Sequence, residues 1–240
     1  MMICIPSSIT EVEKRAVRDS AEQAGAKEVY LIHEPMSAAL GIGIDVEEPV
    51  GNMIIDIGGG TTGITVIALA GIVCDQSIRI AGDEFTADIM EALRRYHSLL
   101  IGERTAEQIK IQVGAAMKEI DNPPDYFAVN GRDLVTGIPK QIMVSYQEIA
   151  EALDKSIFKI EEAILKALEQ TPPELAADIS ERGMVLTGGG ALLRNLDRLI
   201  TEETGMPVVV AEDPLTCVAR GGGRALEIID EMGAGFLVKD

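Results

Sequence analysis

The chain has 240 residues, of which 47% are hydrophobic and 25% charged, a mixture typical of soluble globular proteins with a sizeable core. Its net charge of −18, from 39 acidic and 21 basic residues, argues against binding to nucleic acid or to an anionic membrane surface. Three dispersed cysteines and the lack of a long apolar run favour a reduced, cytoplasmic protein.

The first fifty residues are expected to form short strands and helices. An apolar run predicts a strand over 2–5, and Thr10 with Glu13 has the capping-box spacing that opens a helix over 10–24. A second strand is predicted over 28–32, a short helix entered through Pro35, and an acidic loop over 45–51. Glu34 lies at the corner between this strand and helix, where a carboxylate is either simply solvated or orients a water for attack on a phosphate.

The stretch "IIDIGGGTTGITVIAL" (54–69) places three glycines between two runs rich in β-branched residues. It therefore predicts a hairpin and excludes the strand-to-helix turn of a P-loop. The turn is either structural only or a phosphate cradle, in which exposed glycine amides and threonine hydroxyls bind the anion and Asp56 holds Mg²⁺ through water. The candidate residues are Asp56, Gly58, Gly59, Gly60, Thr61 and Thr62.

The middle of the chain is expected to be mainly helical. A strand over 72–80 precedes helices over 85–100 and 105–118, a small β element within 122–139, and a long helix from the capping residue Ser145 to about residue 169. On the 105–118 helix, Glu107 and Lys110 share one face. They form either a solvated surface pair or a carboxylate for ribose hydroxyls beside an ammonium near a nucleoside.

Two further Gly-Gly-Gly runs occur, at 188–190 and 221–223. The first follows an apolar strand and precedes "ALLRNLDRLI", which predicts a helix N-terminus directed at a ligand in the turn. The second lies within a helical pattern that follows another strand and an Asp-Pro turn, and we interpret it as a site of close helix packing.

Taken together, these segments resemble the MreB/Mbl family of bacterial actin homologues, in the superfamily of actin and heat-shock chaperone ATPases. The resemblance covers essentially the whole chain. It rests on the order of "CIPSSITEVEKRAVRDSAEQAGAKEVYLIHEPMSAALGIGI", "MIIDIGGGTTGITVIALAGIV", "SIRIAGDEF", "LLIGERTAEQIKIQVGAA", "VLTGGGALLRNLDRLI" and "DPLTCVARGGGRAL".

The resemblance implies roles for the candidate residues. Glu34 would position the hydrolytic water, and Asp56 with residues 58–62 would form the second phosphate motif. Residues 213–215 would close the adenine side. The nucleoside contacts that it implies come from two segments: Glu107, Gln108, Ile109 and Lys110, and Gly188, Gly189, Gly190 and Ala191.

The resemblance also implies an α/β, actin-like ATPase fold of two RNase-H-like lobes around a nucleotide cleft. We expect residues 1–52 to be a remnant of a truncated first lobe, 53–225 a complete second lobe with a small insertion at about 85–145, and 226–240 a C-terminal tail. Family members begin with a first phosphate motif before the "CIPS" strand. Without this motif we expect weak or no ATP hydrolysis.

The function that the resemblance implies is that of a cell-shape-determining cytoskeletal protein, which binds ATP and Mg²⁺ and self-associates into filaments that guide cell-wall synthesis. Its partners would be cell-wall synthesis and shape proteins at the inner membrane, with no nucleic acid. Three alternatives are a small-molecule phosphotransferase, a chaperone-type ATPase module, and an inert α/β domain.

Overall fold

A five-stranded sheet forms the centre of the structure, a computed structural model that describes residues 1–232 and 235–238. The strand order is β10-β9-β3-β4-β5. The five strands are β3 (Asn52–Ile57), β4 (Thr62–Ala68), β5 (Gly71–Ile78), β9 (Met184–Thr187) and β10 (Val208–Val210). β3 pairs antiparallel with β4 and parallel with β9. The expected hairpin is therefore confirmed, and its first strand lies inside the sheet.

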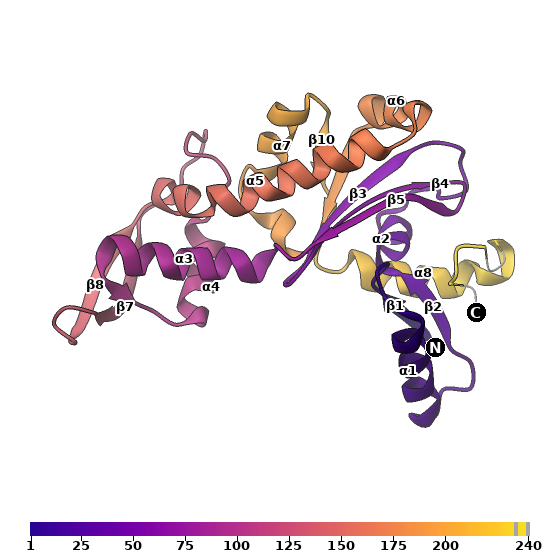
Figure 1. The fold of residues 1–240 in the computed structure, drawn as a ribbon, viewed down its shortest axis with the longest axis horizontal. Helices are drawn as coiled ribbons and strands as arrows, with labels where there is room; N and C mark the ends of the chain where they lie inside the picture. Colours follow the sequence, from indigo (N-terminus) through magenta and orange to yellow (C-terminus); the bar gives the residue numbers. More distant parts are fainter. Residues whose placement is uncertain (233–234, 239–240) are drawn as a thin grey trace.

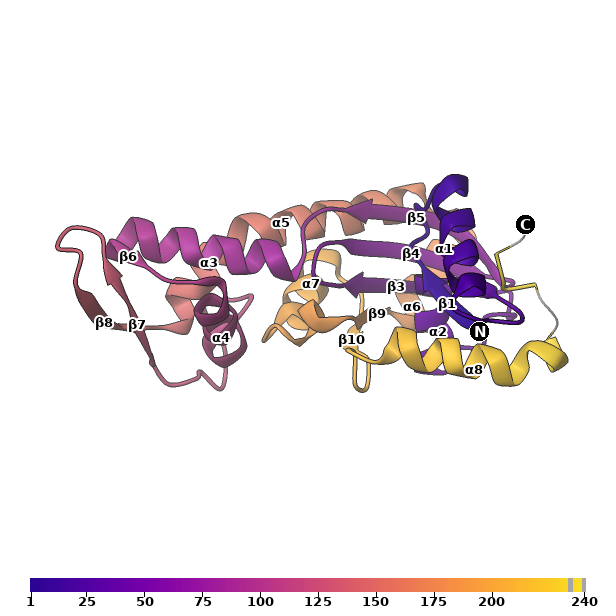
Figure 2. The same cartoon turned by 90° about the horizontal axis from the view of Figure 1, so that it is seen from below.

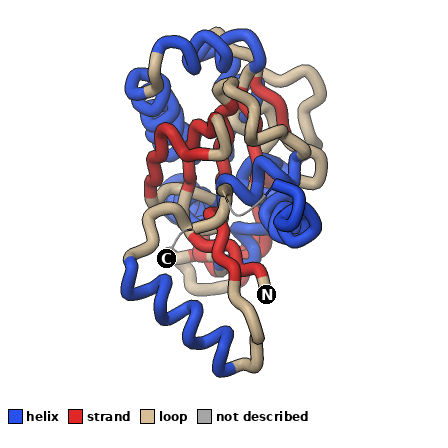
Figure 3. Tube along the Cα trace, turned by 90° about the vertical axis from the view of Figure 1, so that its right-hand side faces the viewer, coloured by secondary structure: helices blue, strands red, loops and turns tan. Residues whose placement is uncertain are grey.

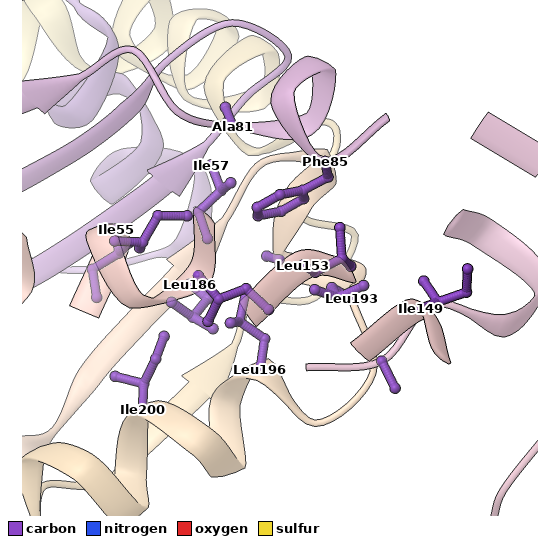
Figure 4. Close-up of a cluster of buried hydrophobic side chains, with 14 of the residues drawn as sticks. Ile55, Ile57, Ala81, Phe85, Ile149, Leu153, Leu186, Leu193, Leu196 and Ile200 are labelled. Atoms are coloured by element: carbon purple, nitrogen blue, oxygen red, sulfur yellow. The ribbon is translucent and has the colours of Figure 1, made fainter. Parts of the chain in front are cut away.

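Helices cover both faces of this sheet (Figure 1). One face packs against α5 (Tyr146–Gln170), α6 (Pro173–Arg182) and α7 (Leu196–Thr204), and the other against α2 (Glu34–Ile42) and α8 (Cys217–Met232). Successive strand residues point to opposite faces, so Ile55 and Ile57 join the core under α5 and α7 (Figure 4), whereas Ile54 joins the core with α2. By the same alternation Asp56 lies on the α2 side.

The first fifty residues form a smaller layer. β1 (Met2–Ile5) and β2 (Tyr30–His33) are a parallel pair, and α1 (Glu11–Gln23) packs on one face through the cluster that contains Ile5 and Leu31. Figures 1 and 3 show α1 projecting away from the main sheet. The expected capping box is present, with Glu13 accepting from the backbone amide of Thr10 at 2.9 Å.

An α/β insertion extends the molecule on the side opposite to α1 and α8 (Figure 2). It contains α3 (Gly82–His97), β6 (Leu99–Leu100), α4 (Glu103–Val113), β7 (Phe127–Asp133) and β8 (Pro139–Val144), with strand order β6-β7-β8. The expected small β element is confirmed. The helix boundaries differ from those expected. α3 begins and ends three residues early, so that residues 99–100 form β6 instead of helix. α4 begins two residues early, and it ends at Val113 because Gly114 leaves the helical conformation, with ψ of 137°.

The third glycine run packs closely at Gly221, as expected, whereas Gly223 in the same run is exposed. A Cβ atom on Gly221 would lie 1.6 Å from the carbonyl oxygen of Ser37, and one on Gly41 would lie 2.0 Å from that of Cys217. The backbones of α2 and α8 are therefore in direct contact at these two glycines.

Three features depart from the sequence analysis. α6 was not predicted. The 188–190 run enters a 3₁₀ helix, Gly189–Leu192, and α7 begins only after Asn195, so the expected α-helix does not start at that turn. α8 also runs through the expected domain boundary between residues 225 and 226. Among the described residues, none of the helices combines the length and apolarity needed to cross a membrane.

Candidate functional site

The glycine turn joins β3 to β4 and rests against the start of α3. The amide of Gly58 donates to the carbonyl of Thr61 at 3.0 Å, which closes the turn. The first amides of α3 then cap it, since Gly82 N donates to Gly58 O at 3.0 Å and Asp83 N to Gly59 O at 2.8 Å. The amides of Gly59 and Gly60 make no hydrogen bond to any described residue, so they remain available to an anion.

Two carboxyl groups converge beside this turn. Asp56 is at the end of β3, and Glu34 is the first residue of α2, which packs on the same face of the sheet. Burial raises the pKa of Asp56, and burial followed by the charge of Asp56 raises the pKa of Glu34. Both ionised groups would therefore be stabilised by a nearby cation.

Two cavities meet at Asp56, Gly58 and Gly59. The smaller, of about 340 Å³, is also lined by Glu34, Thr61 and four further hydroxyl-bearing residues, Ser7, Ser8, Thr65 and Ser77. The larger, of about 800 Å³, combines polar residues at one end with an apolar wall made by Phe85, Ile111, Leu192, Leu193, Pro214 and Leu215. A continuous space therefore runs from the glycine turn to an apolar region large enough for a nucleobase.

Glu107 and Lys110 form an ion pair on the wall of the larger cavity, with 2.6 Å between Lys110 Nζ and Glu107 Oε2. Lys110 Nζ also donates to Gly82 O at 2.8 Å and to Thr86 Oγ1 at 3.1 Å. Burial opposes ionisation of Glu107, but the hydrogen bonds from Lys110 and Thr86 outweigh it and lower the pKa of the carboxyl. The pair is thus an anchored part of the cavity wall.

The second glycine run lies against the first. Gly188 has φ of 82°, and a Cβ there would lie 2.4 Å from Ile57 O and 2.5 Å from Asp56 Oδ1. Its amide donates to Pro214 O at 3.0 Å, which brings the 213–215 turn alongside. Only glycine fits this left-handed, crowded position without strain. The loops that the sequence analysis singled out therefore meet at one end of the larger cavity.

Five of the expected contact residues do not line either cavity, and one of them is Gly60 of the glycine turn. The Thr62 side chain is fully buried and its hydroxyl donates to Ile80 O at 2.6 Å, so it supports the hairpin instead of offering a donor. Along α4, the spacing that turns Glu107 and Lys110 to the cavity turns Gln108 to solvent and Ile109 into the core. Ala191 is likewise a core residue.

The sequence analysis missed Asp83 and Thr86, which lie in the first turns of α3. The Asp83 carboxylate lies next to the glycine turn: a Cβ atom on Gly59 would be 3.5 Å from Asp83 Oδ1. A signal was present for Asp83, which follows "AG" directly, but the expected helix began at Phe85, the first apolar residue of the pattern.

The carboxylates fit a hydrated divalent cation better than a closed metal cage. Within residues 1–232 and 235–238, no three His, Cys, Asp or Glu side chains are grouped to hold a metal ion. Mg²⁺ usually keeps several waters and binds through one or two carboxylates together with phosphates. The larger cavity is lined by Asp56, Asp83 and Glu107 against Lys110 alone among its described charged residues, so a polyphosphate would need such a cation here.

Known protein sequences match almost the whole length of this chain. The family model described as "MreB/Mbl protein" matches residues 1–234. The cell shape-determining protein MreB of Escherichia coli K12 is 56% identical over 238 residues, covering 97% of this chain and 67% of the relative. The cell shape-determining protein Mbl of Bacillus subtilis 168 is 48% identical over 232 residues, covering 97% and 69%. The chain thus spans about two thirds of these relatives.

Solved structures are also similar. MreB5 of Spiroplasma citri bound to ADP superimposes with a TM-score of 0.93 at 38% identity, covering 96% of this chain and 70% of that one. The same protein bound to AMPPNP gives the same score, with 69% of that chain covered. The MamK double helical filament superimposes with a TM-score of 0.77 at 24% identity, covering 94% and 68%. These superpositions confirm the actin-like ATPase fold.

Proposed function

Because the chain belongs to the MreB/Mbl family, we propose that it is a cell-shape-determining, actin-like cytoskeletal protein that binds ATP with Mg²⁺ and self-associates into filaments. Support comes from the relatives named cell shape-determining proteins, from ADP and AMPPNP bound to Spiroplasma citri MreB5, and from the filament formed by MamK. We also propose that cell-wall synthesis proteins are its partners. We further propose that the chain divides into a first lobe over 1–52 and a second lobe over 53–225.

The observation that carries the nucleotide proposal is the continuous space between the two glycine loops. In this arrangement the amide of Gly59 and the hydroxyl of Thr61, which line the cavities, receive the phosphates, at a point where no Cβ keeps the anion from the backbone. The adjacent amide of Gly60, which makes no bond to a described residue, adds a second backbone donor. The apolar wall receives the base, and Glu107 accepts hydrogen bonds from the ribose.

The proposed roles of the carboxylates follow from their places. Asp56 would hold Mg²⁺ through water, and the cation would offset the negative charge of the phosphates beside Asp83. Glu34 reaches the smaller cavity beyond the turn, and its carboxylate orients a water toward the terminal phosphate. Both carboxyls would then be held in their ionised forms, because a nearby cation opposes the effect of burial on their pKa.

A calorimetric titration of Mg-ATP into the purified chain tests nucleotide binding. We expect saturable binding, weaker when EDTA removes Mg²⁺, and a loss of about tenfold or more in Glu107→Ala, because hydrogen bonds to charged groups are worth about 1.5–3 kcal/mol. Glu162→Ala, on the exposed face of α5, is the matched control and should bind as the wild type does. A folded chain that binds no Mg-ATP at millimolar concentration would contradict the proposal.

Filament formation needs a separate measurement. Light scattering and electron microscopy should show polymers that appear with Mg-ATP and not with Mg²⁺ alone. Nucleotide binding with no assembly at any protein concentration would leave the nucleotide proposal standing and overturn self-association.

A further inference from the structure

The ammonium group of Lys110 is fully committed within the protein. Its three N–H groups have three acceptors: Glu107 Oε2 at 2.6 Å, Gly82 O at 2.8 Å and Thr86 Oγ1 at 3.1 Å. Its side chain is only 15% exposed. Lys110 therefore organises the wall of the larger cavity, and it has no further donor for a bound nucleoside.

Thr86 completes this cluster from the opposite helix. Its hydroxyl accepts from Lys110 and has one hydrogen, with Glu107 Oε2 at 2.8 Å and Gly82 O at 3.0 Å as acceptors. Lys110 already donates to Gly82 O, and a bond to a carboxylate is stronger than one to a carbonyl. The Thr86 hydroxyl therefore donates its hydrogen to Glu107 Oε2. With Oε2 holding both donors, Glu107 Oε1 has no hydrogen-bond partner among the described residues.

Glu107 also borders a second cavity, which gives its carboxylate an alternative direction to turn. A neighbouring cavity of about 460 Å³ lies between α3 and α4, and Glu107 lines both this cavity and the larger one. Arg104 lines the neighbouring cavity and offers a second cation. Because the Glu107 side chain is 46% exposed, burial alone does not hold its conformation.

We propose that Thr86 is a positioning residue that sets the selectivity of this cleft for a ribonucleotide. By fixing Oε2, it keeps Glu107 Oε1 directed at the larger cavity as the acceptor for the ribose hydroxyls. Without the Thr86 hydroxyl, Glu107 divides its time between that position and the side of Arg104. This inference rests on the proposed nucleotide function and adds a residue of α3 to it.

The test compares Mg-ATP with Mg-2′-deoxy-ATP by calorimetry in four proteins: the wild type, Thr86→Val, Thr86→Ser and Thr171→Val. Valine matches threonine in shape but lacks the hydroxyl, whereas serine keeps it. Thr171 is the control because it is also buried and its hydroxyl also lies within hydrogen-bond distance of the carbonyl four residues earlier, Ala167 O at 2.7 Å, but it lies at the end of α5.

We expect the wild type to prefer ATP by about tenfold, as removal of a hydrogen bond to a charged group usually costs. In Thr86→Val this ratio should approach one, mainly through weaker ATP binding, and Thr86→Ser and Thr171→Val should keep it. Thr86→Val should also lose ATP affinity at a higher pH than the wild type on acidification, because Glu107 loses one of the two hydrogen bonds that lower its pKa.

The outcomes separate this inference from the proposed function. If the wild type binds no ATP, the nucleotide function itself fails and the inference fails with it. If the wild type binds ATP but Thr86→Val keeps the same preference, or weakens both nucleotides equally, Thr86 is a structural residue only and the inference is wrong.

Discussion

The contact between α2 and α8 yields a sharp prediction, because two glycines of α8 have different surroundings. Gly221 lies against the backbone of α2, whereas Gly223 has open space around it. In Gly221→Ala the added methyl would lie 1.6 Å from Ser37 O, whereas ordinary contacts begin at about 3.4 Å. The obstacle is backbone and cannot rotate away. The two helices must therefore separate locally by about 1.8 Å, the difference between these two distances.

The size of the effect follows from what α2 buries. Met36 and Leu40 pack into the core between α2, α8 and the sheet, and a gap of about 1 Å already removes roughly half of a dispersion contact. Overpacking of cores costs about 1–3 kcal/mol, and a backbone obstacle belongs at the upper end. We expect a loss of about 3 kcal/mol, which lowers Tm by about 6–12 °C in a chain of this size.

Gly223→Ala is the matched control. A Cβ on Gly223 meets nothing within 4 Å, and the residue is exposed within the same helix. Alanine there should raise stability by about 1 kcal/mol through helix propensity alone. Thermal and urea unfolding of both variants measure the difference. Equal shifts in the two variants would refute the claim that the glycine at 221 is required by backbone contact.

Two further predictions concern carboxyl groups outside the cleft. Burial, followed by the charges of Glu203 and Asp154, raises the pKa of Glu161, so its contribution to stability is present below the ordinary Glu pKa and is lost as pH rises through the folded-state value. Glu161→Gln should therefore raise Tm at pH 7 but not near pH 3, and a gain equal at both would contradict this reasoning. The amides of Thr136 and Val135 lower the pKa of Asp133 to about 2, so its contribution is present above the ordinary Asp pKa and is lost as pH falls through about 2. Asp133→Ala should speed hydrogen exchange at these two amides and Asp125→Ala should not; unchanged exchange would show that the Asp133 bonds do not hold the turn.

Local signals in the sequence predicted most helices and strands. They failed where contacts with residues distant in the sequence determine a helix boundary or a side-chain partner. Ser145 shows both: its hydroxyl accepts from the amide of Glu148 at 3.3 Å, as the capping spacing predicts, but the Glu148 carboxylate pairs with His97 instead of returning to the cap. The start of α3 at Gly82 depends on Gly58 O, which is remote in sequence. The length of α4 was overestimated because Gly114 ends it.

The candidate site was predictable to the level of segments and less so to single side chains. The i,i+3 spacing placed Glu107 and Lys110 together, and the same helical geometry removes Gln108 and Ile109 from the cavity. Hydroxyl chemistry alone could not separate Thr61 from Thr62, because that depends on which residue enters the β4 ladder and meets Ile80 O. Thr86 has its partners on α4, about twenty residues away, and no pattern in its own helix marks it.

The N-terminus of α3 is hydrogen-bonded to the glycine turn, so a small movement of the turn would tilt the whole helix. Its 16 residues extend about 24 Å at 1.5 Å per residue, and its far end carries the β6-β7-β8 sheet (Figure 2). A tilt of about 10° at Gly82 and Asp83 would move that end by roughly 4 Å. A displacement of the turn that is too small to disturb the main sheet would thus shift the β6-β7-β8 sheet by several ångströms.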